Sequence, residues 1–295
     1  METIVRWMFI FILVAVECQV YAQYLEIEDG NNITRLQGDE INAEWSPDSS
    51  TLLFQSVRDS VSTLCLYLPQ SDTLLCYSNK DYNFRNPVWH PDGDKIVFDS
   101  RKGGTDYLYE LDLVTHKVKP LFNRSIVCRN ATFSSSPRQV YFTGYNELSD
   151  SWEIYSYDFV YDNLNPLTNF GLGAGDSDIS TDGKSIIYCK ANPFKRTKKL
   201  EMINWYGERL ISFDEFNAYY PSWGPAGLKL YFVSNMNNRK EELYSIWKDG
   251  SHLERITDDE VRIASPVVSP DGTKIAMSVL TENGWDIFIF PFEDY

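Results

Sequence analysis

Apolar runs and polar turns alternate along this chain with a period of about 45 residues. A leading apolar residue followed by a turn motif related to Ser-Pro-Asp-Gly occurs six times, and the intervals between the leading residues are 44, 44, 46, 44 and 45. A fixed period of this length predicts an array of similar units, none of which could bury its apolar face alone. The six motifs are Trp45–Asp48, Trp89–Gly93, Phe133–Pro137, Ile179–Gly183, Trp223–Gly227 and Val268–Gly272.

Each motif precedes runs of alternating apolar and polar residues, which indicate β-strands. In the second unit these runs are Ile96–Ser100, Tyr107–Leu113 and Val118–Phe122. Together with the strand that carries the leading residue, they give four strands per unit, and no window predicts an amphipathic helix of useful length. We therefore expect an all-β fold, and six four-stranded units predict a six-bladed β-propeller.

The two ends of the repeat array predict how the ring closes. The last unit ends at Phe292, directly after its third strand, whereas Asn32–Leu36 resembles the fourth strand Leu253–Thr257. We therefore expect the N-terminal segment to complete the sheet that the C-terminus begins. A further strand-like run, Tyr24–Glu28, has no position in this scheme.

The Pro-Asp-Gly part of the motif has a structural role in this scheme. Proline presets φ for the first turn position, aspartate accepts a hydrogen bond from the backbone, and glycine supplies a positive φ. We therefore assign the aspartates of the motifs to tight turns between the first two strands of each unit. The leading aromatic residues are expected to pack between neighbouring sheets.

The first 22 residues predict an export signal. Arg6 gives a weakly positive start, Trp7–Val16 is an uninterrupted apolar run, and Val20-Tyr21-Ala22 offers a cleavage site before Gln23. The run has 10 residues, whereas a membrane-spanning helix needs roughly 17 to 25. A membrane anchor or a lipid on Cys18 are the alternatives. We expect residues 23–295 to form a single propeller domain that is periplasmic or secreted.

Export makes disulfide bonds possible. Cys65 and Cys76 flank the predicted turn Pro69–Asp72, and a hairpin symmetric about this turn places the two cysteines opposite each other. Opposed residues lie about 4.5–5.5 Å apart at Cα, which a disulfide can span. We therefore predict a Cys65–Cys76 bridge and expect Cys128 and Cys189 to be free and packed as small apolar residues. Without a Cys-x-x-Cys pair or a histidine cluster, the sequence predicts no metal and no cofactor.

The Trp-Ser-Pro-Asp-Gly motif and the strand that follows it, such as Lys95–Ser100, resemble the repeat of the TolB-type six-bladed propellers. The resemblance extends over residues ~30–295. The type member of this family, TolB, is a periplasmic component of the Tol–Pal envelope system and acts by binding other proteins. TolB carries an additional N-terminal α/β domain, for which we expect no counterpart here. The resemblance therefore implies an exported propeller without establishing membership of Tol–Pal.

The net charge of −15 excludes some partners. There is no basic field to neutralise the phosphates of a nucleic acid or to adsorb to an anionic membrane surface. Catalytic signatures are also missing, because no Gly-x-Ser-x-Gly motif occurs and the three histidines (His90, His116 and His252) are not expected to converge. Metal-dependent propellers of the oligogalacturonate lyase type need histidines that this chain lacks. We assign no catalytic residue.

Loop positions give the candidate binding site, because function in propellers usually lies on the loops around the central channel. Counting back three residues from each leading residue gives six positions, which we expect to form a ring near one mouth of the channel. The alternative is that the asparagines and aspartates among them only satisfy the backbone of the loop. The six residues are Asn42, Asn86, Asn130, Asp176, Tyr220 and Ser265.

Tyrosine and arginine residues near this ring could form the rim of a docking surface, because both types are enriched at binding hot spots. They are Tyr82, Arg85, Arg129, Tyr219 and Arg262. The sequence thus predicts a non-enzymatic module that binds a protein or peptide, as a monomer or as a subunit of an envelope complex. A hydrolytic or carbohydrate-active propeller is the first alternative, using carboxylates such as Asp39, Glu40, Asp176 or Asp178. A purely structural subunit of an envelope complex is the second.

Overall fold

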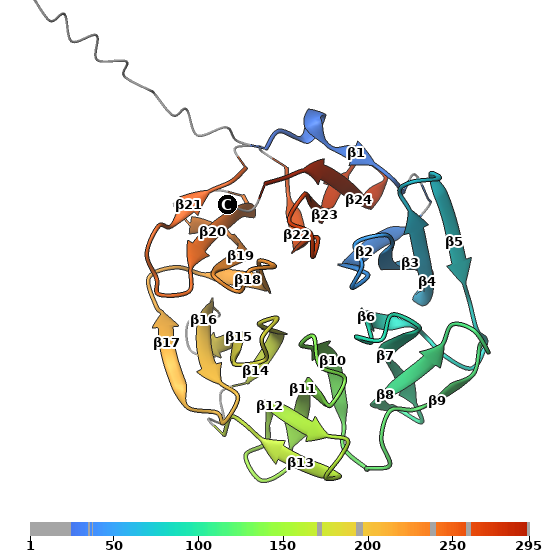
Figure 1. Ribbon diagram of the computed structural model, residues 1–295, viewed down its shortest axis with the longest axis vertical. Helices are drawn as coiled ribbons and strands as arrows, with labels where there is room; N and C mark the ends of the chain where they lie inside the picture. Colours follow the sequence, from blue (N-terminus) through green and yellow to red (C-terminus); the bar gives the residue numbers. More distant parts are fainter. Residues whose placement is uncertain are drawn as a thin grey trace, which may run out of the picture.

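The computed structural model describes residues 25–34, 36, 38–169, 173–192, 197–236, 240–257 and 261–293. These residues form six four-stranded antiparallel sheets arranged radially around a central axis (Figure 1). The predicted all-β six-bladed propeller is thereby confirmed. The predicted export signal lies outside the described residues. Within the described part of the chain, no helix has the length and apolar character needed to cross a membrane.

Each of the first five blades runs in chain order from its innermost to its outermost strand. Blade 1 contains β2 (Asp39–Trp45), β3 (Leu52–Arg58), β4 (Val61–Leu68) and β5 (Thr73–Tyr77). Blade 2 contains β6 (Arg85–Trp89), β7 (Lys95–Lys102), β8 (Thr105–Asp112) and β9 (Val118–Pro120). Blade 3 contains β10 (Cys128–Phe133), β11 (Gln139–Asn146), β12 (Ser151–Asp158) and β13 (Asn163–Pro166).

The remaining three blades complete the ring in the same order. Blade 4 contains β14 (Ala174–Ile179), β15 (Ser185–Asn192), β16 (Thr197–Asn204) and β17 (Arg209–Phe213). Blade 5 contains β18 (Ala218–Trp223), β19 (Lys229–Ser234), β20 (Glu242–Trp247) and β21 (Glu254–Arg255). Blade 6 contains β22 (Ile263–Val268), β23 (Lys274–Thr281), β24 (Gly284–Pro291) and, from the other end of the chain, β1 (Asn31–Asn32).

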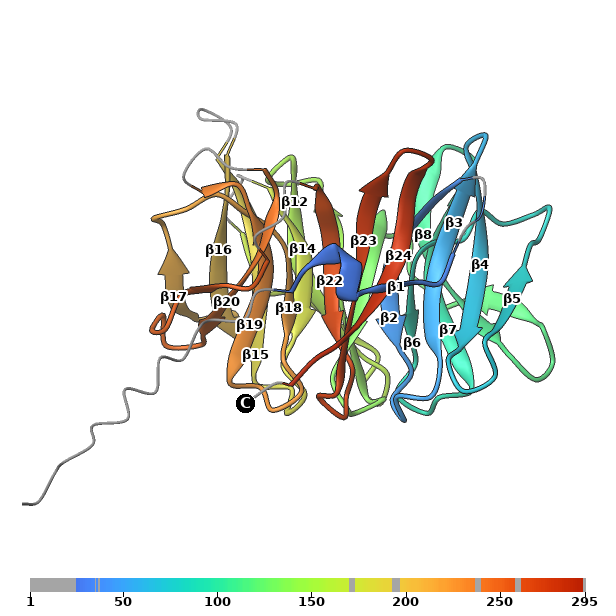
Figure 2. The same ribbon diagram turned by 90° about the horizontal axis from the view of Figure 1, so that it is seen from above.

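Strand β1 closes the ring as predicted, because it pairs with β24 on the outer edge of blade 6 (Figures 1 and 2). The side chain of Thr34 fastens this strand: its hydroxyl donates to Asp286 (3.1 Å) and accepts from the backbone N–H of Ile287 (2.8 Å). In blade 5, Thr257 accepts the N–H of Leu243 in the same way (3.0 Å). Thr34 is therefore the counterpart of Thr257 in blade 5.

The structure also shows where the strand-like run near residue 25 lies. Leu25 forms a parallel bridge with Thr257, and its N–H donates to the carbonyl of Ile256 (2.8 Å). A short 3-10 helix, η1 (Ile27–Asp29), then leads towards β1. The N-terminal segment therefore contacts blade 5 before it completes blade 6, so it is not an additional strand of the closing blade.

The apolar core consists of layers between neighbouring blades. The layer between blades 1 and 2 combines Leu53 and Leu64 with Trp89, Ile96 and Phe98, all of which are buried. The leading tryptophan of a motif thus packs between sheets, as the sequence predicted. Each blade buries its apolar faces only against its neighbours, which explains why the motif recurs with a fixed period.

The turn motifs confirm the structural assignment of their aspartates. The hydroxyl of Ser46 donates to Asp48 (2.6 Å) and accepts the N–H of Thr51 (2.9 Å), which closes the turn between β2 and β3. The same serine-to-aspartate bond recurs between Ser269 and Asp271 (2.6 Å). These hydrogen bonds from serine lower the pKa of Asp48 and of Asp271. The carboxylates are held as acceptors within their turns.

The predicted disulfide joins Cys65 in β4 to Cys76 in β5, where the two residues are direct partners in the ladder. Cys65 is fully buried and packs in the layer between blades 6 and 1. Cys128 and Cys189 are free and buried, as expected, and burial raises the pKa of the Cys128 thiol to about 12.

Replacing both Cys65 and Cys76 by alanine is expected to lower the free energy of unfolding by about 2–3 kcal/mol. The bridge closes a loop with a sequence separation of 11 residues, and removing it returns chain entropy to the unfolded state. Denaturant unfolding with and without a reductant measures the effect. The wild-type protein should lose this stability on reduction, and a double variant that still responds to the reductant would contradict the assignment.

Candidate functional site

The innermost strand of every blade contains a β-bulge at the same repeat position. The antiparallel register shifts between the residue before and the residue after this point in all six blades. The bulge residue has φ between 45° and 56°, the left-handed region. We call these residues the bulge ring; they are Asn42, Asn86, Asn130, Asp176, Tyr220 and Ser265.

The bulge ring is the set of six residues that counting back from the motifs predicted, and all six line one cavity of about 430 Å³ on the axis. They lie within the innermost strands and not in the connections that precede them. Asparagine and aspartate tolerate the left-handed conformation better than other non-glycine residues. The backbone therefore accounts for four of the six residues, which favours the alternative reading for these four positions.

Hydrogen bonds between side chains fix one part of the bulge ring. The amide of Asn42 donates to Oδ1 of Asn86 (2.8 Å), and the hydroxyl of Ser265 donates to Oδ1 of Asn42 (3.1 Å). Gln55, on the second strand of blade 1, accepts from the Asn42 side chain (3.3 Å) and from the backbone N–H of Asn86 (2.7 Å). Blades 6, 1 and 2 are thus joined at this mouth of the channel.

Asp99, on the second strand of blade 2, continues this network into blade 3. Its Oδ1 accepts from the Asn86 amide (2.7 Å) and from the backbone N–H of Asn130 (3.3 Å), and its Oδ2 pairs with Arg85 (3.0 Å). Burial raises the pKa of Asp99 to about 6, and the hydrogen bond from Asn86 and the charge of Arg85 only partly oppose this rise. The carboxylate is a support for the bulge ring that the sequence did not indicate.

Tyr220 differs from the rest of the bulge ring. A bulky residue in the left-handed region is an outlier, yet the Tyr220 side chain is 41% exposed and its hydroxyl makes no hydrogen bond to any described residue. Burial raises the pKa of Tyr220, and the nearby Asp176 carboxylate adds to the rise. Asp176 itself pairs with Lys198 (2.7 Å), whose ammonium lies 5.8 Å from the centroid of the Tyr219 ring.

Two of the predicted rim residues serve the scaffold. Tyr82 packs edge-on against the rings of Phe98 and Tyr109 in the core layer of blade 2. The guanidinium of Arg85 pairs with Asp106 (2.6 Å) as well as with Asp99. These contacts give both side chains a structural role in the scaffold.

Of the other predicted rim residues, Arg129 lies on β10, Tyr219 lies on β18, and Arg262 directly precedes β22. Arg129 stacks over the ring of Trp152, with its guanidinium carbon 4.1 Å from the ring centroid. Arg262 forms an ion pair with Glu241 (2.8 Å). Arg129 has no carboxylate partner among the described residues, so its charge remains available at this face.

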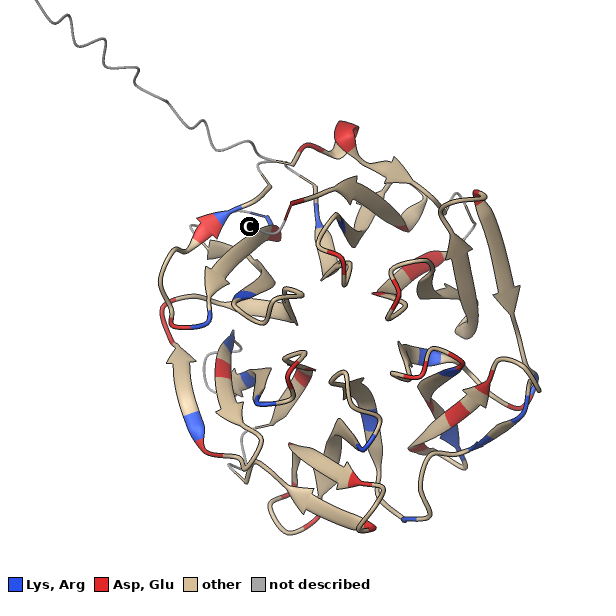
Figure 3. Ribbon diagram, viewed as in Figure 1, with Lys and Arg blue, Asp and Glu red and all other residues tan. Residues whose placement is uncertain are grey.

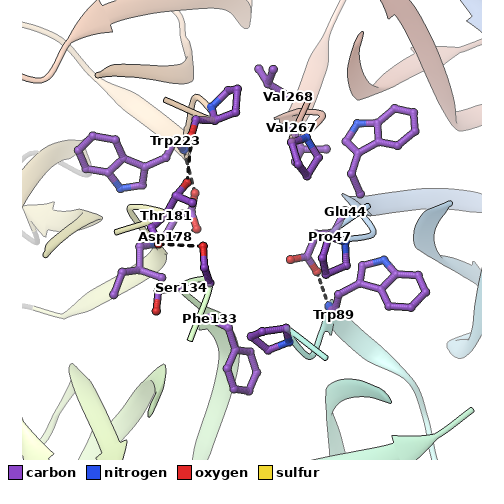
Figure 4. Close-up of a pocket in the computed structure, with 16 residues that line it drawn as sticks. Glu44, Pro47, Trp89, Phe133, Ser134, Asp178, Thr181, Trp223, Val267 and Val268 are labelled. Carbon is purple, nitrogen blue, oxygen red and sulfur yellow. Dashed lines mark hydrogen bonds between the residues drawn. The ribbon is translucent and has the colours of Figure 1, made fainter. Parts of the chain in front are cut away.

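A second set of side chains surrounds the axis one residue before each leading residue. We call it the constriction ring; its members are Glu44, Val88, Thr132, Asp178, Ser222 and Val267. A second cavity, of about 410 Å³, lies on the side of the Pro-Asp-Gly turns, and both cavities are lined by Glu44, Asp178 and Val267 (Figure 4). The two cavities are therefore the two ends of one channel, and the constriction ring separates them.

The two carboxylates of the constriction ring each bind the backbone of the next blade. Glu44 Oε2 accepts the N–H of Trp89 (2.7 Å), and Asp178 Oδ2 accepts the N–H of Trp223 (2.8 Å). Burial raises the pKa of Glu44 well above its usual value and also raises the pKa of Asp178. The sequence analysis did not identify Glu44, which occupies the repeat position one residue before each leading residue.

The carboxylates proposed for the hydrolytic alternative are divided between two places. Asp176 and Asp178 line the channel. Asp39 instead accepts the backbone N–H of Trp285 (3.1 Å), and Glu40 is buried and accepts the hydroxyl of Ser56 (2.8 Å). Asp39 and Glu40 line neither channel cavity.

The three histidines lie in separate turns. His90 lies in the turn after β6, where its Nδ1 is 3.2 Å from Asp92 and its ring packs against Phe133. His116 stacks on Tyr77, and His252 lies beside Trp247. They do not come together in one site.

The lining of the channel is acidic. Glu44, Asp176 and Asp178 line it, whereas neither cavity has Lys, Arg or His among its described lining residues. Figure 3 shows further acidic segments near the axis in several blades. The arrangement offers hydrogen-bond acceptors and negative charge along the axis.

Fold and site together define a six-bladed propeller whose channel is lined by apolar side chains together with the carboxylates of Glu44, Asp176 and Asp178. The family model described as the TolB beta propeller domain matches residues 13–226, and the chain belongs to this family. A comparison with curated proteins found no match.

Solved structures show the same fold. TolB from Acinetobacter baumannii is 22% identical, with a TM-score of 0.65 over 79% of this chain and 58% of that chain. A putative TolB from Agrobacterium tumefaciens is 19% identical, with a TM-score of 0.64 over 78% of this chain and 90% of that one. An oligogalacturonate lyase in complex with manganese is 12% identical, with a TM-score of 0.60 over 88% and 90%. The chain thus spans 58% of the length of the Acinetobacter protein.

Proposed function

We propose that this chain is an exported, non-enzymatic propeller of a bacterial envelope, which binds a protein or peptide at the bulge-side mouth of its channel. Membership of the TolB beta propeller family supports this proposal, because TolB-type propellers bind other proteins. The scaffold supports it too, since a rigid ring of hydrogen-bonded side chains presents a preorganised surface. We propose no cofactor and neither nucleic acid nor membrane insertion after cleavage of the export signal.

Tyr220 is the observation that carries the proposal. Four of the six bulge residues are Asn or Asp, which suit the left-handed backbone, whereas tyrosine is strained there. Strain of this kind persists mainly where the surrounding structure imposes it, and it is concentrated at functional sites. A half-exposed tyrosine at the rim of a cavity is also the type of side chain that dominates binding energy at interfaces. Tyr220 therefore fits a role in recognition better than one in folding.

Replacing Tyr220 by asparagine is expected to stabilise the protein by about 1 kcal/mol, because asparagine relieves the strain of the bulge. The same variant is expected to lose binding of the partner protein or peptide. Both effects can be measured on residues 23–295: stability by thermal unfolding, and binding by capture from a bacterial envelope extract followed by mass spectrometry of the retained proteins.

Tyr206 provides the matched control, because it is an exposed tyrosine on the turn between β16 and β17. Tyr206→Asn should retain every partner that the wild-type protein retains. Partners that bind both variants equally, or a folded wild-type protein that retains no discrete partner, would contradict the proposed function.

A further inference from the structure

The constriction ring contains two carboxyl groups that pair with no basic side chain of the described residues. Asp176 pairs with Lys198, but neither Glu44 nor Asp178 has an ion-pair partner among the described residues. They lie on opposite sides of the channel (Figure 4). Carboxylates enclosed by protein are normally paired with a cation or with several hydrogen-bond donors.

Donors of the protein satisfy the two carboxylates unequally. Asp178 accepts three hydrogen bonds, from the hydroxyl of Thr132 (3.0 Å) and from the backbone N–H groups of Ile179 (2.8 Å) and Trp223 (2.8 Å). From the described residues, Glu44 accepts only one, through Oε2. Its Oε1 receives no hydrogen bond from the described residues, and Figure 4 shows the carboxylate directed into the channel. Glu44 is therefore the group with capacity for an external donor.

Ser222 adds a polar side chain to the same ring. It lines the same cavity as Glu44 and Asp178 and is only 8% exposed, and its hydroxyl has no hydrogen-bond partner among the described residues. The hydroxyl itself has almost no accessible surface, so a ligand could reach it only after the side chain rotates towards the channel.

We propose that the constriction ring binds a lysine or arginine side chain of the partner, inserted from the bulge-side mouth, with its cationic head between Glu44 and Asp178. This inference rests on the proposed function and names the chemistry that the partner must present. Ammonium and guanidinium groups carry three and five N–H donors and no acceptor, which matches a site composed of acceptors. Val88 and Val267, in the same ring, can contact the aliphatic stem of such a side chain.

The electrostatics of the channel agree with this proposal. Burial and the neighbouring Asp178 hold the pKa of Glu44 well above its usual value, so the ionised form lacks stabilisation that a bound cation would supply. An acidic or acceptor-only side chain would be repelled at the same place.

Selection from a random heptapeptide library against the wild-type protein tests the proposal directly. Sequences enriched on the wild-type protein should carry Lys or Arg at one fixed position. The enriched peptide is then synthesised with norleucine, which keeps the stem and removes the charge, at that position. Binding is followed by tryptophan fluorescence, because Trp45, Trp89 and Trp223 line the channel. The norleucine peptide should bind at least about tenfold more weakly.

Variants of the protein locate the contact. Glu44→Gln should weaken the lysine peptide about tenfold and leave the norleucine peptide unchanged, and Ser222→Ala should give a smaller loss for the lysine peptide. Glu254→Gln, at the exposed outer edge of blade 5, is the matched control and should bind like the wild type. The peptide substitution keeps the test decisive even if a channel variant fails to fold.

The outcomes separate the inference from the proposed function. Enriched peptides that carry no basic residue at a fixed position, or a norleucine peptide that binds as tightly as the lysine peptide, would overturn the inference and leave peptide binding intact. No enrichment of any sequence on folded protein would count against the proposed function itself, and the inference would fall with it.

Discussion

Replacing Thr34 by valine is expected to lower the free energy of unfolding by about 3 kcal/mol. Valine keeps the shape of threonine but removes the hydroxyl, which donates to Asp286 and accepts the backbone N–H of Ile287. Both groups lie in the closed ring at a buried position, where each unsatisfied partner costs about 1–3 kcal/mol. The contact joins residues 252 positions apart, so the loss weakens the closure of the whole ring.

The equivalent threonine of blade 3 provides a control for this prediction. Thr168 donates to Glu153 and accepts the N–H of Ile154 (2.9 Å), which is the same arrangement within one hairpin. Thr168→Val should therefore destabilise to a similar extent, but hydrogen exchange should accelerate in blade 3 only. Thr34→Val should instead accelerate exchange in β24 and β22–β23. A loss below about 1 kcal/mol for Thr34→Val would show that the hydrogen bonds of Thr34 to Asp286 and Ile287 do not hold the ring closed.

The period of the motifs was sufficient to predict the number of blades, the four strands of each and the N-terminal closure. It could not give the register of the closing strand, because that register depends on the bond between Thr34 and Asp286, which no local pattern encodes. The disulfide was predictable for the opposite reason. Cys65 and Cys76 belong to one hairpin, so a local turn determines their pairing.

The candidate site was predictable only where the repeat position determines it. Counting from the motifs found the bulge ring, yet the left-handed backbone that explains Asn42 and Asn86 is a property of strand pairing that became evident only in three dimensions. Glu44 could not be identified from the sequence, because its repeat position also holds Val, Thr and Ser and therefore shows no common chemistry. Its significance arises from enclosure in the channel, and sequence patterns do not report enclosure.

Asp99 is expected to make the protein less stable as the pH rises from about 4 to about 7. Its pKa in the folded protein is about 6 because the carboxyl is buried, against a usual value of 3.8. Between these two values the folded state binds more protons than the unfolded state, so the contribution of Asp99 is fully present below pH 3.8 and is lost as the pH rises through 6. The difference corresponds to about 3 kcal/mol, since one pKa unit is equivalent to about 1.4 kcal/mol.

Asp99→Asn is expected to remove this pH dependence, because an amide does not titrate. Urea unfolding at pH 4, 5, 6 and 7 should show the wild type losing about 2.4 kcal/mol relative to the variant across the series, because part of the full difference is already lost at pH 4. Asp59→Asn, at an exposed turn, is the control for the chemical change. Parallel profiles for the wild type and Asp99→Asn would contradict the assignment. Asp99 also supports Asn86 and Asn130, so its ionisation bears on the rigidity of the bulge ring. The buried Asp99 carboxylate therefore lowers the free energy of unfolding near neutral pH. The same carboxylate orders the mouth of the channel through its hydrogen bonds to Asn86 and Asn130.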